Sequence, residues 1–262
     1  MTTTVTDTKL TRILVEVEDA IARITLRNPP VNVIDIAMMQ ELTRALAELE
    51  LQTRVSVVIF SGEGRAFSAG VDIAAHTPDK VEEMLSKFHA LIRAVLACKK
   101  ITSASIHGLC LGGGAELAMV CDFVYTRDDA EWGFPEIKLG CFPPVACAAL
   151  AGLIGQKRAA ELILTGRSIT GREAAEIGLA TRAVPGRQLG STVDASIAQL
   201  LHLSPAALAV AKKACYAWDA MHMDKGLGRA EKIYFEDLMT TADAQEGVRA
   251  FLEKRSPKWR GQ

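Results

Sequence analysis

The 262-residue sequence predicts an α/β fold in which a layered core with a mainly parallel sheet is followed by a helical C-terminal part. In the first half, short β-rich runs alternate with longer segments of helical periodicity, which is typical of strands and helices packed in layers. In the second half, helical segments follow one another almost to the end. No linker or low-complexity stretch divides the chain, so we expect one continuous structure. Within it we expect a disordered start over 1–9, a core over 10–200 and a helical region over 201–262.

The first half opens with two β-rich runs, 13–17 and 21–26, which Glu18 and Asp19 separate. Runs this close predict a hairpin. A helix is expected over 36–50, because Met39, Leu42, Leu46 and Leu49 recur on one helical face. The elements expected next are strand 55–60, helix 81–96, strand 101–106, helix 115–121 and strand 123–125.

The second half reads as helices. Thr170 precedes Glu173 by three residues, which is a capping-box signature for a helix start. The helices expected are 145–154, 156–164, 170–177, 189–203, 205–218, 227–239 and 243–254.

Composition narrows the classes of function. The net charge is −1 and no run of Lys and Arg exceeds two residues, so neither a nucleic-acid partner nor a membrane surface is expected. No apolar stretch is long enough to span a membrane, and the polar residues 1–9 do not resemble a signal peptide. We therefore expect a cytoplasmic protein.

Cysteine and histidine spacing does not indicate a metal site. The six cysteines form no Cys-x-x-Cys pair and the five histidines are scattered. We expect the cysteines to be buried thiols, as free cysteines usually are. His107 lies beside a glycine-rich loop, where we expect a structural role.

That loop, residues 107–118, carries the first chemical signal. Gly112, Gly113 and Gly114 precede a helical run, so bare backbone amides lie at the positive end of a helix and could hold an oxyanion. A dinucleotide fingerprint fails because Leu117 stands where glycine is needed, and a phosphate loop fails because lysine is missing. The alternative is a tight turn without chemistry.

Two acidic residues form the second signal. Glu116 follows the glycines directly, and Glu136 follows Pro135 twenty positions later. A pair of carboxylates in one site can move protons, and their proximity pushes their pKa values apart. Taken singly, Glu116 also fits a solvated residue in a first helical turn, and Glu136 fits a loop carboxylate.

A third segment, 65–73, follows the expected strand and is rich in small residues. The order Ser-Ala-Gly-Val-Asp-Ile, then Leu-Gly-Gly-Gly-Ala-Glu, then Phe-Pro-Glu resembles the crotonase (enoyl-CoA hydratase/isomerase) family, from Asn28 to Arg255. The resemblance implies a crotonase-type ββα spiral core with a helical C-terminal trimerisation part. It also implies an acyl-CoA thioester substrate, no cofactor beyond the coenzyme A of that substrate, and a homotrimer or dimer of trimers.

The resemblance also assigns residues. The amides of Val71 and Gly113 would hold the thioester carbonyl, with Glu116 as general base and Glu136 as general acid. The last helices would contact the coenzyme A of a neighbouring subunit, with Phe251 near its adenine and Lys254 near a phosphate. The other residues assigned to the substrate site are Ser68, Ala69, Gly70, Asp72, Ile73, Gly112 and Pro144.

The sequence departs from the common family pattern at Pro144, which occupies the place of a glycine whose amide helps to hold the catalytic water. Proline has no amide to donate. The local run from Phe142 resembles the branch that hydrates cyclic dienoyl-CoA thioesters, as cyclohexa-1,5-dienecarbonyl-CoA hydratase does. The alternative is that the two prolines only stiffen a loop.

The leading hypothesis is hydration of a 2-enoyl- or cyclic dienoyl-CoA thioester. A second hypothesis uses the same pocket for double-bond isomerisation or hydrolysis, but isomerases of the family often lack the first glutamate, so Glu116 favours hydration. A third is a noncatalytic or RNA-binding relative, which the near-neutral charge and the presence of both glutamates disfavour.

Overall fold

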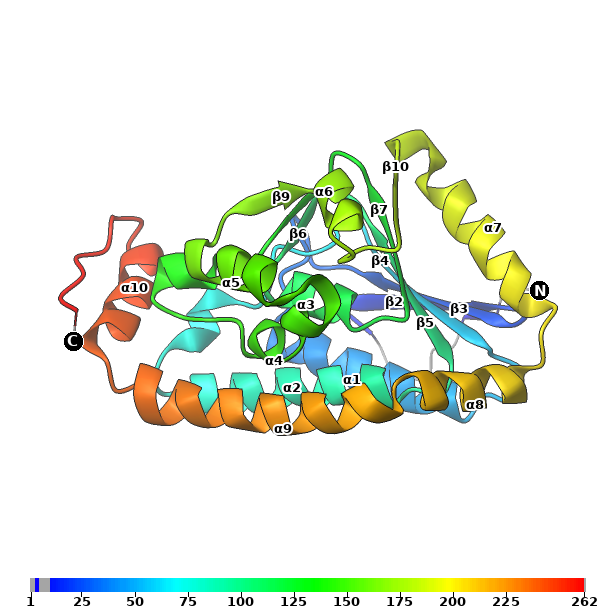
Figure 1. Cartoon of the computed structure of the whole chain (residues 1–262), viewed down its shortest axis with the longest axis horizontal. Coiled ribbons are helices and arrows are strands. Elements are labelled where there is room, and N and C mark those ends of the chain that lie inside the picture. The colour runs from blue at the N-terminus through cyan, green and yellow to red at the C-terminus, as the bar shows by residue number, and fades with distance from the viewer. Residues whose placement is uncertain (1–2, 5–9, 262) are drawn as a thin grey trace.

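The computed structural model of the chain describes residues 3–4 and 10–261, with the backbone alone for 3–4 and 217–222. A seven-stranded sheet has the order β1-β2-β3-β4-β5-β7-β10 (Figure 1). The first three strands pair antiparallel and all later pairs are parallel. Its strands are β1 (Thr3–Thr4), β2 (Ile13–Glu18), β3 (Ile21–Leu26), β4 (Val57–Gly62), β5 (Ile101–Ile106), β7 (Phe123–Arg127) and β10 (Arg182–Val184).

A second, three-stranded sheet positions the site. It consists of β6 (Leu109–Leu111), β8 (Glu131–Gly133) and β9 (Ser168–Thr170). β6 and β8 are parallel, with Leu111 opposite Gly133, and the Gly112 amide donates to the Gly133 carbonyl at 2.9 Å. The segments that leave these two strands therefore start side by side.

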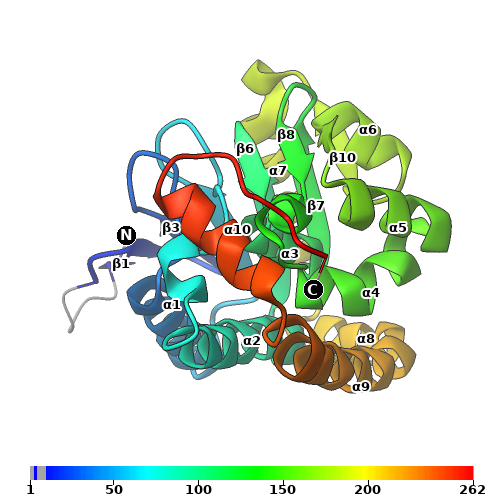
Figure 2. The same cartoon turned by 90° about the vertical axis from the view of Figure 1, so that its left-hand side faces the viewer.

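Helices cover the large sheet and fill the C-terminal part. α1 packs against α2, and α4 packs against α9, which runs alongside α2 (Figures 1 and 2). The helices are α1 (Ile36–Glu50), α2 (Val81–Ala97), α3 (Gly113–Met119), α4 (Pro144–Ile154), α5 (Gln156–Thr165), α6 (Gly171–Glu176), α7 (Leu189–Leu201), α8 (Pro205–Cys215), α9 (Ala217–Ile233) and α10 (Ala242–Leu252). Three short 3₁₀ turns, 73–76, 135–139 and 186–188, and a π-helical turn, Tyr234–Leu238, complete the elements.

The hairpin, the α/β class and the helical C-terminal part are confirmed. β2 buries Ile13, Val15 and Val17, which alternate along the strand and so point to one face. That face of β2 packs against the core. Helix 36–50 has the predicted bounds, and Thr170 caps α6 by accepting a hydrogen bond from the Glu173 amide at 3.1 Å.

Other expectations were incomplete. The short strands β6, β8, β9 and β10 were not predicted, because three residues are too few to show a period. α9 begins ten residues before the predicted position, 227, and α10 ends at Leu252, so Lys254 lies beyond that helix. Apart from β1, the prediction of disorder over 1–9 lies outside the described residues.

The expectation of buried thiols holds for four cysteines and is wrong for two. Cys98, Cys110, Cys121 and Cys141 are buried, whereas Cys147 lies on the outer side of α4 and Cys215 at the exposed end of α8. His107 has the expected structural contact, a hydrogen bond between its Nε2 and the Gly64 carbonyl at 2.9 Å. Among the described residues, no single helix is long and apolar enough to cross a membrane; one bent pair, 186–201 with 205–215, qualifies by combined length and composition alone.

Candidate active site

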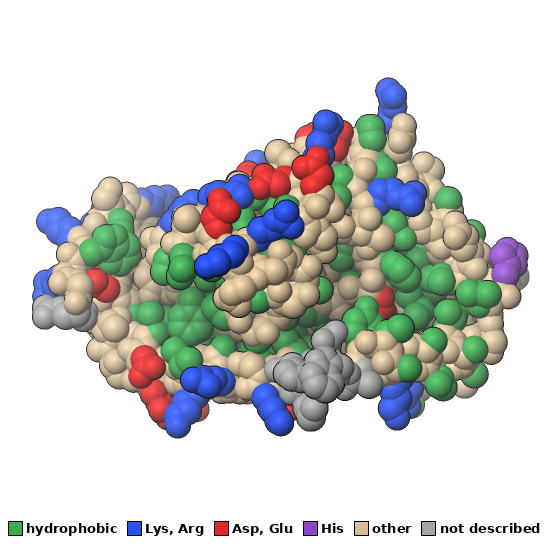
Figure 3. Space-filling view, in the orientation of Figure 1, with side chains coloured by type: hydrophobic (Ala, Val, Ile, Leu, Met, Phe, Trp, Pro, Cys, Tyr) green, Lys and Arg blue, Asp and Glu red, His purple; other side chains and the backbone are tan. Residues whose placement is uncertain are grey.

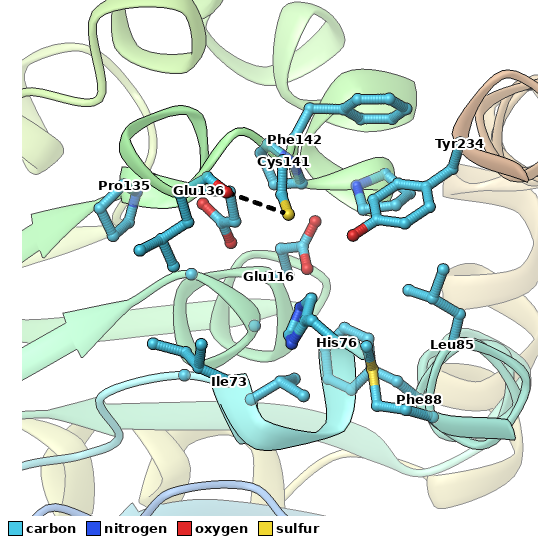
Figure 4. A pocket seen from close by; sticks show the side chains of 18 of the residues that line it. Ile73, His76, Leu85, Phe88, Glu116, Pro135, Glu136, Cys141, Phe142 and Tyr234 are labelled. Carbon is cyan, nitrogen blue, oxygen red and sulfur yellow. Dashed lines mark hydrogen bonds between the residues drawn. The ribbon is translucent and has the colours of Figure 1, made fainter. Parts of the chain in front are cut away.

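A cavity lies where the loop after β4, the start of α3, the segment after β8 and the π-helical turn after α9 meet (Figure 4). Both glutamates line it. Nine of the assigned residues line it: Ala69, Gly70, Val71, Ile73, Gly112, Gly113, Glu116, Glu136 and Pro144.

Glu116 stands in the first turn of α3 and is almost fully buried. Its Oε1 accepts a hydrogen bond from the Ala146 amide at 2.9 Å, at the start of α4. Burial raises the pKa of Glu116 to about 7, and the amides of Ala146 and Val145 oppose that rise. At neutral pH this carboxyl is therefore divided between its two protonation states, as suits a general base.

Glu136 follows Pro135 in a 3₁₀ turn, and its Oε2 is buried without a hydrogen-bond partner among the described residues. Burial first, and the charge of Glu116 second, raise the pKa of Glu136 well above its usual range. The protonated form of Glu136 is thus favoured next to a carboxyl, Glu116, that can ionise.

Gly112 lets the two carboxyls meet in this cavity. A Cβ at this position would lie 2.7 Å from Glu136 Oε1, and the backbone has φ 49° and ψ −128°, which favours glycine. The residue therefore provides both the close approach and the turn from β6 into α3.

The amides of Val71 and Gly113 face the same region. Val71 lies opposite Ile34 in an isolated parallel β-bridge. The hydrogen bonds of that bridge come from the residues on either side of Val71: the Ile34 amide donates to the Gly70 carbonyl at 2.8 Å, and the Asp72 amide donates to the Ile34 carbonyl at 3.2 Å. The Val71 amide therefore points away from that bridge. Gly113 is the first residue of α3, where amides have no partner within the helix.

The two amides are close in space. A Cβ on Gly70 would lie 3.5 Å from the Gly113 nitrogen, and one on Gly113 would lie 2.5 Å from Val71 Cγ2. Within the described part of the chain, neither amide donates to a backbone carbonyl. The arrangement can offer two donors to one oxygen atom in the cavity.

Four assigned residues lie outside the lining. The Ser68 hydroxyl is buried, donates to the Asn32 carbonyl at 2.7 Å and accepts from the Gly70 amide at 3.1 Å. Asp72 accepts from the Ala74 amide at 3.0 Å and starts a 3₁₀ turn. These two contacts hold the loop in shape. Phe251 is exposed in the last turn of α10, and Lys254 is exposed just beyond the end of that helix.

Several lining residues were missed by sequence reasoning. His76 and Tyr234 bring polar groups, and Met84, Leu85, Phe88, Leu139 and Val248 bring apolar surface. Cys141 and Phe142, from the run before Pro143 and Pro144 that the sequence had singled out, also line the cavity. His76 Nδ1 lies 3.1 Å from the Asp72 carbonyl, and burial lowers its pKa. His76 could have been found from the sequence, because it follows Asp72 of the small-residue loop by only four residues. Nothing in the local sequence around Tyr234 indicates that it lines the cavity.

Within the described residues, no group of three or more His, Cys, Asp or Glu side chains is arranged to hold a metal ion. The chemistry that the cavity residues can provide is proton transfer by two carboxyls beside two amide donors.

Comparison with known proteins identifies the family. The family model described as enoyl-CoA hydratase/isomerase matches residues 16–262. The chain belongs to the enoyl-CoA hydratase/isomerase family. It is 34% identical over 250 residues to the cyclohexa-1,5-dienecarbonyl-CoA hydratase of Thauera aromatica, covering 95% of this chain and 96% of that protein.

Solved structures of family members share the fold. The crystal structure of an enoyl-CoA hydratase from Mycobacterium avium subsp. paratuberculosis K-10 superposes with a TM-score of 0.87 at 27% identity, covering 96% of this chain and 99% of that one. An enoyl-CoA hydratase from Bacillus anthracis gives a TM-score of 0.77 at 32% identity, covering 96% and 100%. The crotonase fold is thus confirmed, and membership in this family supports acyl-CoA hydratase activity.

Proposed function

We propose that the protein hydrates an α,β-unsaturated acyl-CoA thioester, with a compact cyclic dienoyl-CoA as its preferred substrate. The observation that carries the proposal is the pair of buried carboxyls, Glu116 and Glu136, beside the amides of Val71 and Gly113 in one cavity. In this proposal coenzyme A belongs to the substrate, and the proton transfers need only groups of the protein.

In the proposed reaction, ionised Glu116 takes a proton from water while the water oxygen bonds to the β-carbon. The π electrons of the C=C bond move toward the thioester, and the two amides stabilise the resulting enolate oxygen. Protonated Glu136 then gives its proton to the α-carbon. One proton passes from Glu116 back to Glu136 before the next turnover.

The pKa shifts support this division of roles. Burial and the charge of Glu116 raise the pKa of Glu136 and favour its protonated form, while burial raises the pKa of Glu116 to about 7. An acid and a base with separated pKa values are what addition of water across a double bond needs.

Pro144 supports the choice of a cyclic acyl group. It is the first residue of α4, it lines the cavity and it has no amide to hold a water molecule. A ring that fills the space beside Pro143 and Pro144 would confine the water against the carboxyls, whereas a straight chain would leave it poorly placed. The similarity to the Thauera aromatica protein supports the same assignment.

The test compares two thioesters by following loss of their ultraviolet absorbance. We expect a higher kcat/KM with cyclohexa-1,5-dienecarbonyl-CoA than with crotonyl-CoA, by up to ~10²-fold if the water is misplaced by about 1 Å. Pro144→Gly should shift the preference toward crotonyl-CoA. A parent enzyme that strongly prefers crotonyl-CoA would leave a general enoyl-CoA hydratase and remove the cyclic assignment.

We further propose that the chain forms a homotrimer or a dimer of trimers, in which Phe251 and Lys254 contact the coenzyme A of a neighbouring subunit. Hydrophobic side chains gather around a hollow on one face of the molecule (Figure 3). Large apolar residues are exposed on α4, α5, α7, α8 and α9: Leu153, Leu164, Leu201, Val210 and Ile233. Apolar surface of this kind favours an interface. Light scattering after size-exclusion chromatography measures the assembly, and a fully active monomer would contradict it.

A further inference from the structure

Tyr234 brings a buried polar group to the cavity that has no role in the reaction proposed above. Its side chain is fully buried, and its hydroxyl makes no hydrogen bond of good geometry with the described residues; its polar neighbour is the Cys141 thiol, a weak partner that already donates to the Leu139 carbonyl at 3.6 Å. It lines the cavity, and Figure 4 shows its hydroxyl pointing inward toward Glu116. Leaving a buried hydroxyl unpaired is unfavourable, so this geometry indicates a polar partner that arrives with substrate or water.

Among the described residues that line this cavity, two have a buried polar atom without a hydrogen bond of good geometry: the Tyr234 hydroxyl and Glu136 Oε2. Glu116 Oε1 is occupied by the Ala146 amide, which leaves its other oxygen for water. A water molecule placed between the carboxyls therefore lies within the region that the tyrosine hydroxyl faces.

Other donors at this end of the cavity are few. Pro144 has no amide hydrogen. His76 is kept neutral by the burial that lowers its pKa, and its Nδ1 faces the Asp72 carbonyl, so Nε2 is left as an acceptor. Among the lining side chains described, Tyr234 has the neutral hydroxyl that can donate to an oxygen held by Glu116.

The position of Tyr234 is fixed by packing, by a hydrogen bond and by an ion pair. Its ring meets Phe142 edge-on with centroids 5.0 Å apart. It begins the π-helical turn that continues α9, a distortion that often marks a functional site. α9 is fastened to α2, since Glu231 Oε1 lies 2.6 Å from His89 Nδ1 and 3.4 Å from an Arg93 nitrogen.

We propose that the Tyr234 hydroxyl holds the reacting water, and the hydroxyl of the product, in place of the amide that Pro144 cannot supply. This inference rests on the hydration proposed above. In the forward reaction Tyr234 donates a hydrogen bond to the water oxygen while Glu116 removes a proton. In the reverse reaction the same bond stabilises the departing oxygen, and the tyrosine keeps its proton throughout.

The test measures two reactions in parallel for wild type and Tyr234→Phe. Hydration of cyclohexa-1,5-dienecarbonyl-CoA and of crotonyl-CoA requires the water. Exchange of the α-protons of butyryl-CoA in D₂O, followed by NMR, requires Glu136 and the two amides but no attacking water. We expect Tyr234→Phe to lower kcat for hydration by about 10- to 100-fold, the range for a hydrogen bond to a charged group. KM and the exchange rate should change by less than about threefold.

Tyr125→Phe is the matched control, because Tyr125 is a buried tyrosine on β7 outside the cavity. It should leave both reactions unchanged. In a Pro144→Gly background, where an amide is restored, the cost of Tyr234→Phe should fall to about fivefold or less, because the two donors then share one role.

The outcomes separate the two proposals. Hydration by Tyr234→Phe at the wild-type rate would overturn this inference alone, as would an equal loss of hydration and exchange, which indicates a general packing defect. A wild type that exchanges α-protons but hydrates neither thioester would overturn the proposed function, and this inference with it.

Discussion

The cavity has two walls that the chain builds in different ways. One, the loop wall, consists of residues 69–71 and 112–113 and presents backbone amides. The other, the helix wall, consists of residues 141–144 and Tyr234 and presents side chains. Strand pairing and a helix start fix the amides, so the loop wall should tolerate shorter side chains but not added atoms. The helix wall depends on the identity of individual side chains.

Glu116 connects the two walls, because α3 carries it and an amide of α4 holds it. Glu116→Gln keeps the size and the hydrogen bond but removes ionisation. We expect kcat for hydration, measured by loss of ultraviolet absorbance, to fall by at least ~10²-fold, as for the loss of a general base. Near-parental turnover in this variant would remove the mechanism.

The same substitution should stabilise the fold. A carboxyl whose folded pKa is raised from 4.5 to about 7 gives stability that is complete below about pH 4.5 and is lost as pH rises through 7. Gln carries no such dependence. At pH 8 we expect Glu116→Gln to increase the free energy of unfolding by about 1–3 kcal/mol, measured by denaturant titration. A loss of stability would indicate that ionised Glu116 is better solvated than its burial suggests.

The loop wall can be tested by adding one carbon atom. In Gly113→Ala the new Cβ would meet Val71 Cγ2 at 2.5 Å and push the two amides apart. A displacement near 1 Å can lower kcat by ~10²-fold. Val71→Ala alone should have little effect, since its amide remains, and combined with Gly113→Ala it should restore part of the activity. Equal, small effects of the two single changes would argue against an oxyanion site here.

The pH profile tests the division of labour between the carboxyls. Since Glu116 must be ionised, kcat/KM should fall about tenfold per pH unit below pH 7. It should also fall at higher pH when Glu136 loses its proton, because burial and then Glu116 raise the pKa of Glu136. These limits belong to the pair rather than to one residue. A rate that does not change between pH 5 and pH 7 would contradict Glu116 as the base.

The smallest effect is expected outside both walls, at Lys254. Lys254→Glu should raise KM for acyl-CoA by about fivefold and leave kcat nearly unchanged, as for one exposed charge contact. Lys157→Glu on α5, also an exposed lysine, is the control and should change neither. Equal KM values in the two variants would remove Lys254 from coenzyme A binding.

The sequence predicts the loop wall far better than the helix wall. The motifs around Val71, Gly113 and Glu116 are short and local, so their resemblance to the crotonase family was enough to propose that these residues meet. The physical link between Glu116 and Glu136, parallel pairing of β6 with β8, was missed because these strands have three residues each. Tyr234 could not be predicted, since its place depends on the packing of α9 against α2 and α4.

Gly112 places a limit on how this site can evolve. Two independent constraints act on it: the contact that a Cβ would make with Glu136 Oε1, and a backbone conformation that favours glycine. Shortening Glu136 to Asp would relieve the first constraint and leave the second, so no single accompanying substitution makes the position permissive. Replacing Gly112 during evolution therefore requires two changes at once: a new backbone conformation in the turn from β6 into α3, and a new position for the Glu136 carboxyl. Single substitutions that lead away from the Glu116–Glu136 pair are few.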